Sequence, residues 1–266
     1  MTNRSQDDTP AEATRRLIRL SSACKRDTDA LMTALREALA EPPGGDQEPA
    51  VIVETSGSSG YPKAVVLPIS SLRASAEATA ARIGAGSWVL ALEQAYVAGL
   101  QVLVRSILAG TDPVVIPASF TAAEFVVAAA RIDEPRYTSL VPAQLARLLD
   151  AADDTAVAEC LRGFAAILVG GQALPATEAD RAAALGIRIV RTYGSSETSG
   201  GCVYDGVPLP GWRCGSWTGR CRSRARSSRA DTSTTTREPR RLSSRMPPAP
   251  AGTGPATSAR STVSSG

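Results

Sequence analysis

The stretch that decides the fold is Val51-Ile52-Val53-Glu54-Thr55-Ser56-Gly57-Ser58-Ser59-Gly60-Tyr61-Pro62-Lys63, where an apolar run breaks into Ser, Thr and Gly. Residues 51–54 predict a short buried strand, and residues 64–67 predict a second one. Glycines allow a close approach of the backbone to a ligand, and successive N–H groups and hydroxyls make a concave donor surface for phosphate oxygens. Lys63 adds a positive charge at the rim. The alternative is a flexible linker, but two framing strands favour a phosphate-binding loop.

This loop differs from the Walker A motif, in which Gly-Lys-[Ser/Thr] opens a helix. Here Tyr61 and Pro62 separate Gly60 from Lys63, and a strand-like run follows. Every position instead resembles the phosphate loop of the adenylate-forming enzymes, which include acyl-CoA synthetases, peptide adenylation domains and luciferases. The resemblance implies that the loop holds the β- and γ-phosphates of ATP. It assigns this role to Thr55, Ser56, Gly57, Ser58, Ser59, Gly60 and Lys63.

Strand-like and helix-like segments alternate after the loop, which predicts an α/β domain with a largely parallel sheet. In such sheets, ligands bind at the carboxyl ends of the strands. The expected strands are residues 88–91, 113–116, 137–140, 165–169 and 187–191. The expected helices are residues 70–83, with a serine as N-cap, 97–108, 122–131, 142–149 and 175–185. Before the loop, residues 10–41 predict two helices separated near 25–27, the second with an apolar stripe at helical spacing.

Two further motifs come directly after predicted strands. The first turns at Gly170-Gly171-Gln172, and the resemblance implies that this turn lies along the adenine and ribose. The second, Thr192-Tyr193-Gly194-Ser195-Ser196-Glu197-Thr198, resembles the signature Tyr-Gly-x-[Ser/Thr]-Glu of the same enzymes. The resemblance implies that the tyrosine stacks on adenine, that the hydroxyls contact the phosphates and that Glu197 holds Mg²⁺, a hard cation that suits a carboxylate. A solvated loop acid is the alternative for Glu197. Lys63, Ser196 and Glu197 are the expected catalytic residues.

A narrower resemblance covers residues 72–76, 88–110 and 137–145, which are similar to o-succinylbenzoate–CoA ligases of menaquinone biosynthesis. Those enzymes normally carry Pro and one or two histidines just before Val-Ala-Gly, whereas this chain has Glu93-Gln94-Ala95-Tyr96 and no histidine anywhere. The candidate substrate residues are Tyr96, Gln101 and Arg105. The last two are expected to contact the carboxylates of the acid, with an ordinary helix surface as the alternative.

The composition divides the chain in two. The formal net charge of +3 averages a net of −6 over residues 1–210 and a net of +9 over residues 211–266, which contain 11 Arg and no Lys. The five cysteines have neither a disulfide-like nor a metal-like spacing, and we see no signal peptide or membrane-spanning run. We therefore expect a reduced, cytoplasmic protein.

Residues 211–266 contain only Leu242, Met246 and Val263 among Leu, Ile, Val and Met, too few to offset the entropy of ordering. We expect an N-terminal helical segment (1–49), a partial AMP-binding α/β domain (50–210) and a disordered Arg/Ser/Thr/Pro-rich tail (211–266). Reading the tail codons one base upstream permits Val-Glu-Val-Arg-Ile-Val-Asp-Gly-Arg, then Gly-Pro-Val-Leu-Ala, then Trp-Tyr-Arg-Thr-Gly-Asp-Leu-Gly. These are three segments of the resembled family in order, so we interpret the tail as frameshifted by the loss of one base near codon 211. An Arg-rich tail for nucleic acid or an acidic membrane is the alternative.

The resemblance implies an ATP-dependent acyl- or aryl-CoA ligase. The carboxylate of o-succinylbenzoate attacks the α-phosphate of ATP·Mg²⁺, and CoA then displaces AMP from the acyl-adenylate. Another acid, or a non-catalytic nucleotide-binding remnant, are the alternatives. The expected partners are the acid, ATP and CoA, without nucleic acid or a membrane span, and we expect impaired activity from the frame as written.

The frameshift hypothesis predicts one additional base in the gene near codon 211. Resequencing this region of the gene is the measurement. We expect resequencing to find this base, in which case the corrected frame continues with Val-Glu-Val-Arg after Gly211. A confirmed original frame would leave two explanations, a base lost in the gene itself and the alternative of an Arg-rich binding tail.

Overall fold

The computed structural model describes residues 16–20, 27–45, 47–56, 62–117, 119–214 and 221–223, all of which belong to one compact unit, Met1–Ala225. The predictions for residues 224–266 lie outside the described residues.

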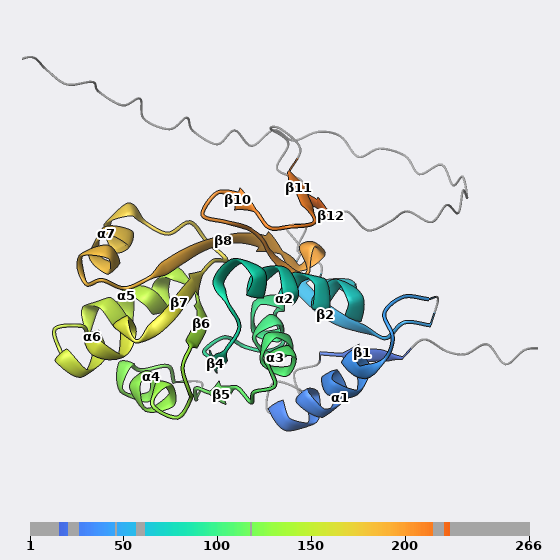
Figure 1. Ribbon diagram of the computed structural model, residues 1–266, viewed down its shortest axis with the longest axis horizontal. Coiled ribbons are helices and arrows are strands. Elements are labelled where there is room, and N and C mark those ends of the chain that lie inside the picture. Colours follow the sequence, from blue (N-terminus) through green and yellow to red (C-terminus); the bar gives the residue numbers. More distant parts are fainter. Residues whose placement is uncertain are drawn as a thin grey trace, which may run out of the picture. The chain divides into compact units, whose positions relative to one another are not determined.

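A seven-stranded sheet is the centre of this unit (Figure 1). In spatial order its strands are β10 (Val207–Pro208), β9 (Gly200–Tyr204), β8 (Ile189–Ser195), β7 (Phe164–Val169), β6 (Arg136–Leu140), β4 (Ser87–Leu90) and β5 (Val114–Val115). The strands from β8 to β5 pair in parallel, whereas β9 and β10 pair antiparallel at the other edge. The prediction of an α/β unit with a largely parallel sheet is therefore confirmed.

Helices cover both faces of this sheet, because its strands are apolar on both sides. Along β7, Ala166 and Leu168 belong to one hydrophobic core, while Ile167 and Val169 belong to the other. Successive side chains of a strand point to opposite faces, so the two cores lie on opposite sides. The first core contains residues from α1 (Thr28–Ala40), α2 (Ile69–Ile83) and α3 (Val97–Ala109). The second contains residues from α4 (Ala122–Ala129), α5 (Pro142–Asp150), α6 (Thr155–Arg162) and α7 (Ala176–Ala184).

The predicted phosphate loop belongs to a second, three-stranded sheet. It consists of β1 (Leu17–Arg19), β2 (Ala50–Ser56) and β3 (Pro62–Pro68), with β1 parallel and β3 antiparallel to β2. Thr55 lies opposite Lys63 in the register of β2 and β3. Strands β2 and β3 therefore form an antiparallel pair, and residues 57–61 between them lie outside the described residues.

Two local expectations are wrong, and one helix was missed. Residues 17–19 form β1 and not part of a first helix, because their backbone pairs with β2. No serine caps α2: the N-cap is Pro68, and the carboxylate of Glu48 accepts the N–H of Ser70 instead. Helix α6 was not expected, although Asp154 at its start accepts the N–H of Ala156 at 2.9 Å and is a recognisable N-cap signal.

Part of the segment predicted as a disordered tail is paired. Strand β11 (Trp212–Cys214) pairs antiparallel with β12 (Cys221–Ser223). The side chain of Trp212 packs against the first core, and its N–H donates to the carbonyl of Leu209 at 3.1 Å. Backbone pairing needs no apolar side chains, which is why composition did not reveal this hairpin. The domain boundaries at 49 and 210 stay predictions.

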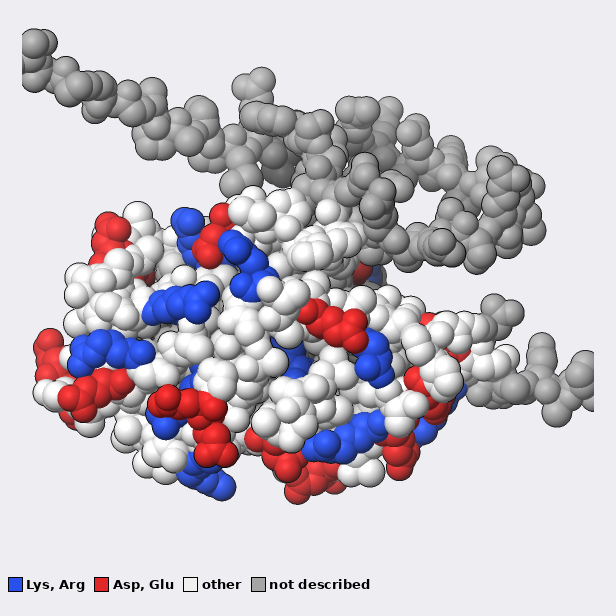
Figure 2. Space-filling view, viewed as in Figure 1, with Lys and Arg blue, Asp and Glu red and all other residues white. Residues whose placement is uncertain are grey.

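Charged groups of both signs are interspersed over the visible face of the molecule (Figure 2). Arg181 pairs with Asp150 at 2.9 Å, and Arg191 pairs with Asp205 at 3.4 Å. Water screens such exposed pairs, so they contribute little and the two cores dominate the stability. Within the described ranges, the structure contains no helix with the length and apolar character needed to cross a bilayer.

The second core predicts a large cost for truncation of Phe125. Its side chain is 0% exposed, and its ring lies 6.2 Å from that of Phe120 and 5.3 Å from that of Phe164. We expect Phe125→Ala to lower the free energy of unfolding by about 3–5 kcal/mol. On the same helix, Val127 is 63% exposed, and Val127→Ala should change it by less than about 0.5 kcal/mol. Urea denaturation measures both, and equal losses would contradict the assignment of this core.

Candidate functional site

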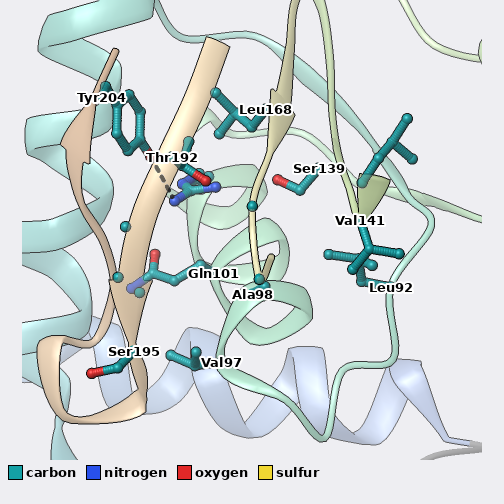
Figure 3. A pocket seen from close by; sticks show the side chains of 17 residues that line it. Leu92, Val97, Ala98, Gln101, Ser139, Val141, Leu168, Thr192, Ser195 and Tyr204 are labelled. Carbon is teal, nitrogen blue, oxygen red and sulfur yellow. Dashed lines mark hydrogen bonds between the residues drawn. The ribbon is translucent and has the colours of Figure 1, made fainter. Parts of the chain in front are cut away.

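A pocket lies between α3 and the carboxyl ends of the parallel strands (Figure 3). Helix α3 contributes Val97, Ala98, Gln101 and Arg105, and the opposite wall comes from β6, β7, β8 and β9. The close-up shows Gln101 and Ala98 on α3 next to Thr192 on β8 and Ser139 on β6. The pocket is therefore at the edge where the topology of a parallel sheet predicts a ligand.

Two glycines leave one side of this pocket as bare backbone. A Cβ on Gly170 would lie 2.3 Å from Oγ1 of Thr192, and a Cβ on Gly194 would lie 2.0 Å from the carbonyl oxygen of Gly200. No side chain fits at either position without movement of its surroundings. Both glycines line the pocket, so a flat ligand can approach their backbone closely.

The turn after β8 positions the predicted metal ligand. A single 3-10 turn, η1 (Ser196–Thr198), follows the strand. The N–H of Ser195 donates to Oγ1 of Thr198 at 2.8 Å, and this hydroxyl in turn donates to the carbonyl of Gly200 at 2.7 Å. Ser199 has φ +54°, in the left-handed region, so the chain reverses directly into β9. These contacts leave the side chain of Glu197 exposed beside the pocket.

The electrostatic surroundings of Glu197 join two motifs that are far apart in the sequence. A hydrogen bond from its own backbone N–H, then one from the hydroxyl of Ser195, and more weakly the charge of Lys63 lower the pKa of Glu197 below its ordinary value. Lys63 belongs to β3, and β3 contacts η1. The small sheet thus brings the end of the predicted phosphate loop to the edge of the large sheet.

Most of the other predicted nucleotide residues lie around the same edge, but Gln172 and Tyr193 do not line the pocket. Gly170, Gly171, Gly194 and Ser195 line the pocket, whereas the exposed Gln172 does not. The Tyr193 side chain is 57% exposed. The hydroxyl of Thr55 donates to the carbonyl of Lys63 at 3.2 Å. Gly57, Ser58, Ser59 and Gly60 lie outside the described residues, and the roles of all these residues, of Ser56 and of Ser196 stay predictions.

The candidate substrate residues divide into two groups. Tyr96 is the N-cap of α3, is 54% exposed and does not line the pocket. Gln101 and Arg105 do line it, and they are 0% and 7% exposed. The alternative of an ordinary helix surface is therefore wrong for these two positions, because α3 is enclosed between α2 and the sheet.

The amide of Gln101 has already used its donors. Its Nε2 donates to the carbonyl of Leu72 at 3.2 Å and to the carbonyl of Ser199 at 2.7 Å. The Oε1 atom has no hydrogen-bond partner among the described residues. Gln101 therefore holds α3 to α2 and to the turn before β9, and what remains for a ligand is an acceptor. An ionised carboxylate cannot donate to this acceptor, so these contacts do not favour the expected role of Gln101 as a carboxylate partner, which stays a prediction.

Arg105 is a buried cation without an acidic partner among the described residues. Burial lowers the pKa of its guanidinium, and its Nε has no hydrogen-bond partner there. Its Nη2 donates to the hydroxyl of Tyr204 at 3.3 Å, and the guanidinium carbon lies 5.1 Å from the centre of the Trp88 ring. The sequence analysis missed Tyr204, which also lines the pocket. No local signal identified it, because only the pairing of β9 brings it to α3.

Comparisons with known proteins agree with this geometry. A family model described as "AMP-binding enzyme" matches residues 3–224. A probable 2-succinylbenzoate–CoA ligase from Mycobacterium tuberculosis is 49% identical over 172 residues, which are 63% of this chain and 44% of that protein. This chain therefore spans less than half the length of the curated relative.

Two solved structures are similar to the described fold. The o-succinylbenzoate coenzyme A synthetase (MenE) from Bacillus subtilis in complex with AMP is 25% identical, with a TM-score of 0.54 over 61% of this chain and 44% of that chain. The same enzyme in complex with ATP and magnesium ion is 24% identical, with a TM-score of 0.54 over 61% and 36% of the two chains. At 24% identity, this second similarity shows only that the two chains share a fold.

The contacts of Glu197 predict an order of effects on its pKa. We expect Ser195→Ala to raise this pKa more than Lys63→Ala does, because the Ser195 hydrogen bond contributes more to the lowering. Lys63→Arg keeps the charge and should leave the pKa unchanged. Since the folded-state pKa is lowered, the associated stabilisation is complete above the ordinary carboxyl pKa and is lost as the pH falls through the lowered value. Carboxyl titration by NMR measures the pKa of Glu197 in all three variants. If Lys63→Ala leaves this pKa unchanged, the charge of Lys63 does not act on Glu197.

Proposed function

Because the chain belongs to the AMP-binding enzyme family, we propose that the pocket beside α3 binds ATP·Mg²⁺ and a carboxylic acid and joins them as an acyl-adenylate. CoA then displaces AMP and forms the thioester. The observation that carries this proposal is the meeting of Lys63 and Glu197 beside a pocket with bare glycine backbone. A cation for phosphates, a carboxylate for a metal and a surface for a flat ring are then available at one edge of the sheet.

In this proposal the nucleotide lies across the ends of β7 and β8. The backbone of Gly170 and Gly171 and the exposed ring of Tyr193 form the adenine site. The phosphates extend toward Lys63 and the hairpin loop after Thr55. Support comes from the position of both glycines in the pocket wall and from the relative of known structure in complex with AMP.

Glu197 is the proposed Mg²⁺ ligand. A glutamate is ionised at neutral pH, and the lowered pKa of Glu197 favours this form further. Mg²⁺ is usually held by one or two carboxylates together with phosphate oxygens and water. The described residues contain no group of three or more His, Cys, Asp or Glu that could hold a metal by itself, so phosphate oxygens would complete the coordination. When bound, the ion neutralises charge on the departing pyrophosphate.

The proposed acid is o-succinylbenzoate, which carries two carboxylates. One carboxylate must reach the α-phosphate, and the second needs a cation. Arg105 is such a cation: it is buried, it lines the pocket, and no described carboxylate pairs with it. An unpaired buried charge is costly, and an anionic substrate group would offset that cost. The 49% identity to a probable 2-succinylbenzoate–CoA ligase supports this acid over other acyl or aryl acids.

We also propose that the residues after 211 are read in a shifted frame. In this case the chain as written binds nucleotide but does not complete thioester formation. The non-catalytic remnant named among the alternatives is therefore the expected state of the present sequence, and the ligase is the expected state of its corrected frame.

Calorimetric titration with ATP tests the nucleotide site. We expect Lys63→Ala to weaken ATP binding about tenfold or more, since a hydrogen bond to a charged group contributes about 1.5–3 kcal/mol. Glu197→Gln should reduce the gain in affinity that Mg²⁺ produces. Glu159→Gln, an equivalent change on the exposed surface of α6, should have no effect. Identical binding by all four proteins would reject the proposed site.

A further inference from the structure

Three elements meet in a chain of buried hydrogen bonds behind the pocket. Nη2 of Arg105 on α3 donates to the hydroxyl of Tyr204 on β9 at 3.3 Å. This hydroxyl lies 2.9 Å from Oγ1 of Thr79 on α2, and Thr79 Oγ1 lies 2.9 Å from the carbonyl of Ser75 one turn earlier. Tyr204 is 0% exposed and Thr79 is 1% exposed, so water does not compete for these bonds.

The direction of this chain follows from counting protons. A threonine hydroxyl has one proton, and Thr79 donates it to the Ser75 carbonyl, which cannot donate in return. Tyr204 must then donate its own proton to Thr79. The lone pairs of the Tyr204 oxygen consequently face Arg105 and accept from Nη2. Thr79 thus fixes the orientation of the tyrosine hydroxyl, and the hydroxyl fixes one edge of the guanidinium.

Arg105 has a second place to go if this bond is lost. A separate cavity of about 300 Å³ lies between α2 and α3 and is lined by Arg105, Trp88, Thr79 and Glu77, among others. The side chain of Arg105 therefore borders both cavities. Glu77 at the rim of this cavity is 59% exposed and lies 3.9 Å from Arg73.

We propose that Tyr204 is a positioning residue that holds Arg105 toward the acid pocket, and that the pocket thereby selects acids with a second carboxylate. Tyr204 acts through Arg105 and not on the reacting atoms. Thr79 supports it by accepting the hydrogen bond from the phenolic hydroxyl. The inference rests on the proposed function, because it assumes that Arg105 receives a carboxylate of the substrate.

The test compares two acids that differ by one carboxylate. The full chain is titrated calorimetrically with o-succinylbenzoate and with 4-oxo-4-phenylbutanoate, which has the same skeleton without the ring carboxylate. We expect Tyr204→Phe to weaken o-succinylbenzoate binding about tenfold and to leave the monocarboxylate unchanged. Thr79→Val should reduce the preference for the dicarboxylate in the same direction, whereas Thr79→Ser keeps the hydroxyl and should behave like the unaltered protein.

The controls separate this inference from the proposed function. If Arg105→Met leaves o-succinylbenzoate binding unchanged, or if the unaltered chain binds neither acid, the proposed acid site itself is wrong. If Arg105→Met removes the preference but Tyr204→Phe keeps it, only the positioning role is overturned. A merely structural role of Tyr204 would weaken both acids equally, which also overturns the inference. Should Tyr204→Phe not fold, the pair Thr79→Val and Thr79→Ser decides the question.

Discussion

A parallel strand that is apolar on both sides must be covered on both faces, and the rest of the structure depends on this constraint. In β7, alternate residues enter two different cores, so helices are required above and below the sheet. Each helix returns the chain to the edge where the strands begin, so the strands run parallel. The carboxyl ends of β6, β7 and β8 therefore lie side by side at the opposite edge. The pocket forms at this edge because α3 alone does not fill the space beside the ends of the neighbouring strands.

Electrostatics join the small sheet to this edge. Thr55 and Lys63 are held opposite each other by the pairing of β2 and β3, and Lys63 contributes to the lowered pKa of Glu197. A lysine near a carboxylate that follows the pocket residue Ser195 by two positions suits a ligand that carries both phosphates and a metal ion. The hairpin supplies the cation, and the large sheet supplies the carboxylate, so neither sheet provides the combination alone.

The buried guanidinium of Arg105 is the most costly group of the pocket. It is removed from water, and burial lowers its pKa. The Trp88 ring and the Tyr204 hydroxyl stabilise it only partly, since neither carries a negative charge. A site that leaves a cation in this state is suited to an anionic ligand, because the ligand supplies what the protein lacks.

The sequence by itself determined the α/β class, the strand-turn motifs and most of the helices and strands. These features depend on local patterns: apolar runs, glycine turns and helical spacing extend over a few residues each. It also indicated Arg105, through a resemblance of the surrounding segment. It did not indicate α6 as a helix, the Glu48 cap of α2 or the pairing of residues 17–19, because these depend on partners elsewhere in the chain.

Only the tertiary structure decided which side chains surround the pocket and what each has left to offer. The sequence indicated Gln101 as a possible hydrogen-bond donor, but the carbonyls of Leu72 and Ser199 occupy both of its N–H groups. Tyr204 carried no signal, yet β9 places it between Arg105 and Thr79. The physical reason is that hydrogen-bond capacity is used up by neighbours in space. A sequence names the donors and acceptors, and the fold determines which of them remain free for a ligand.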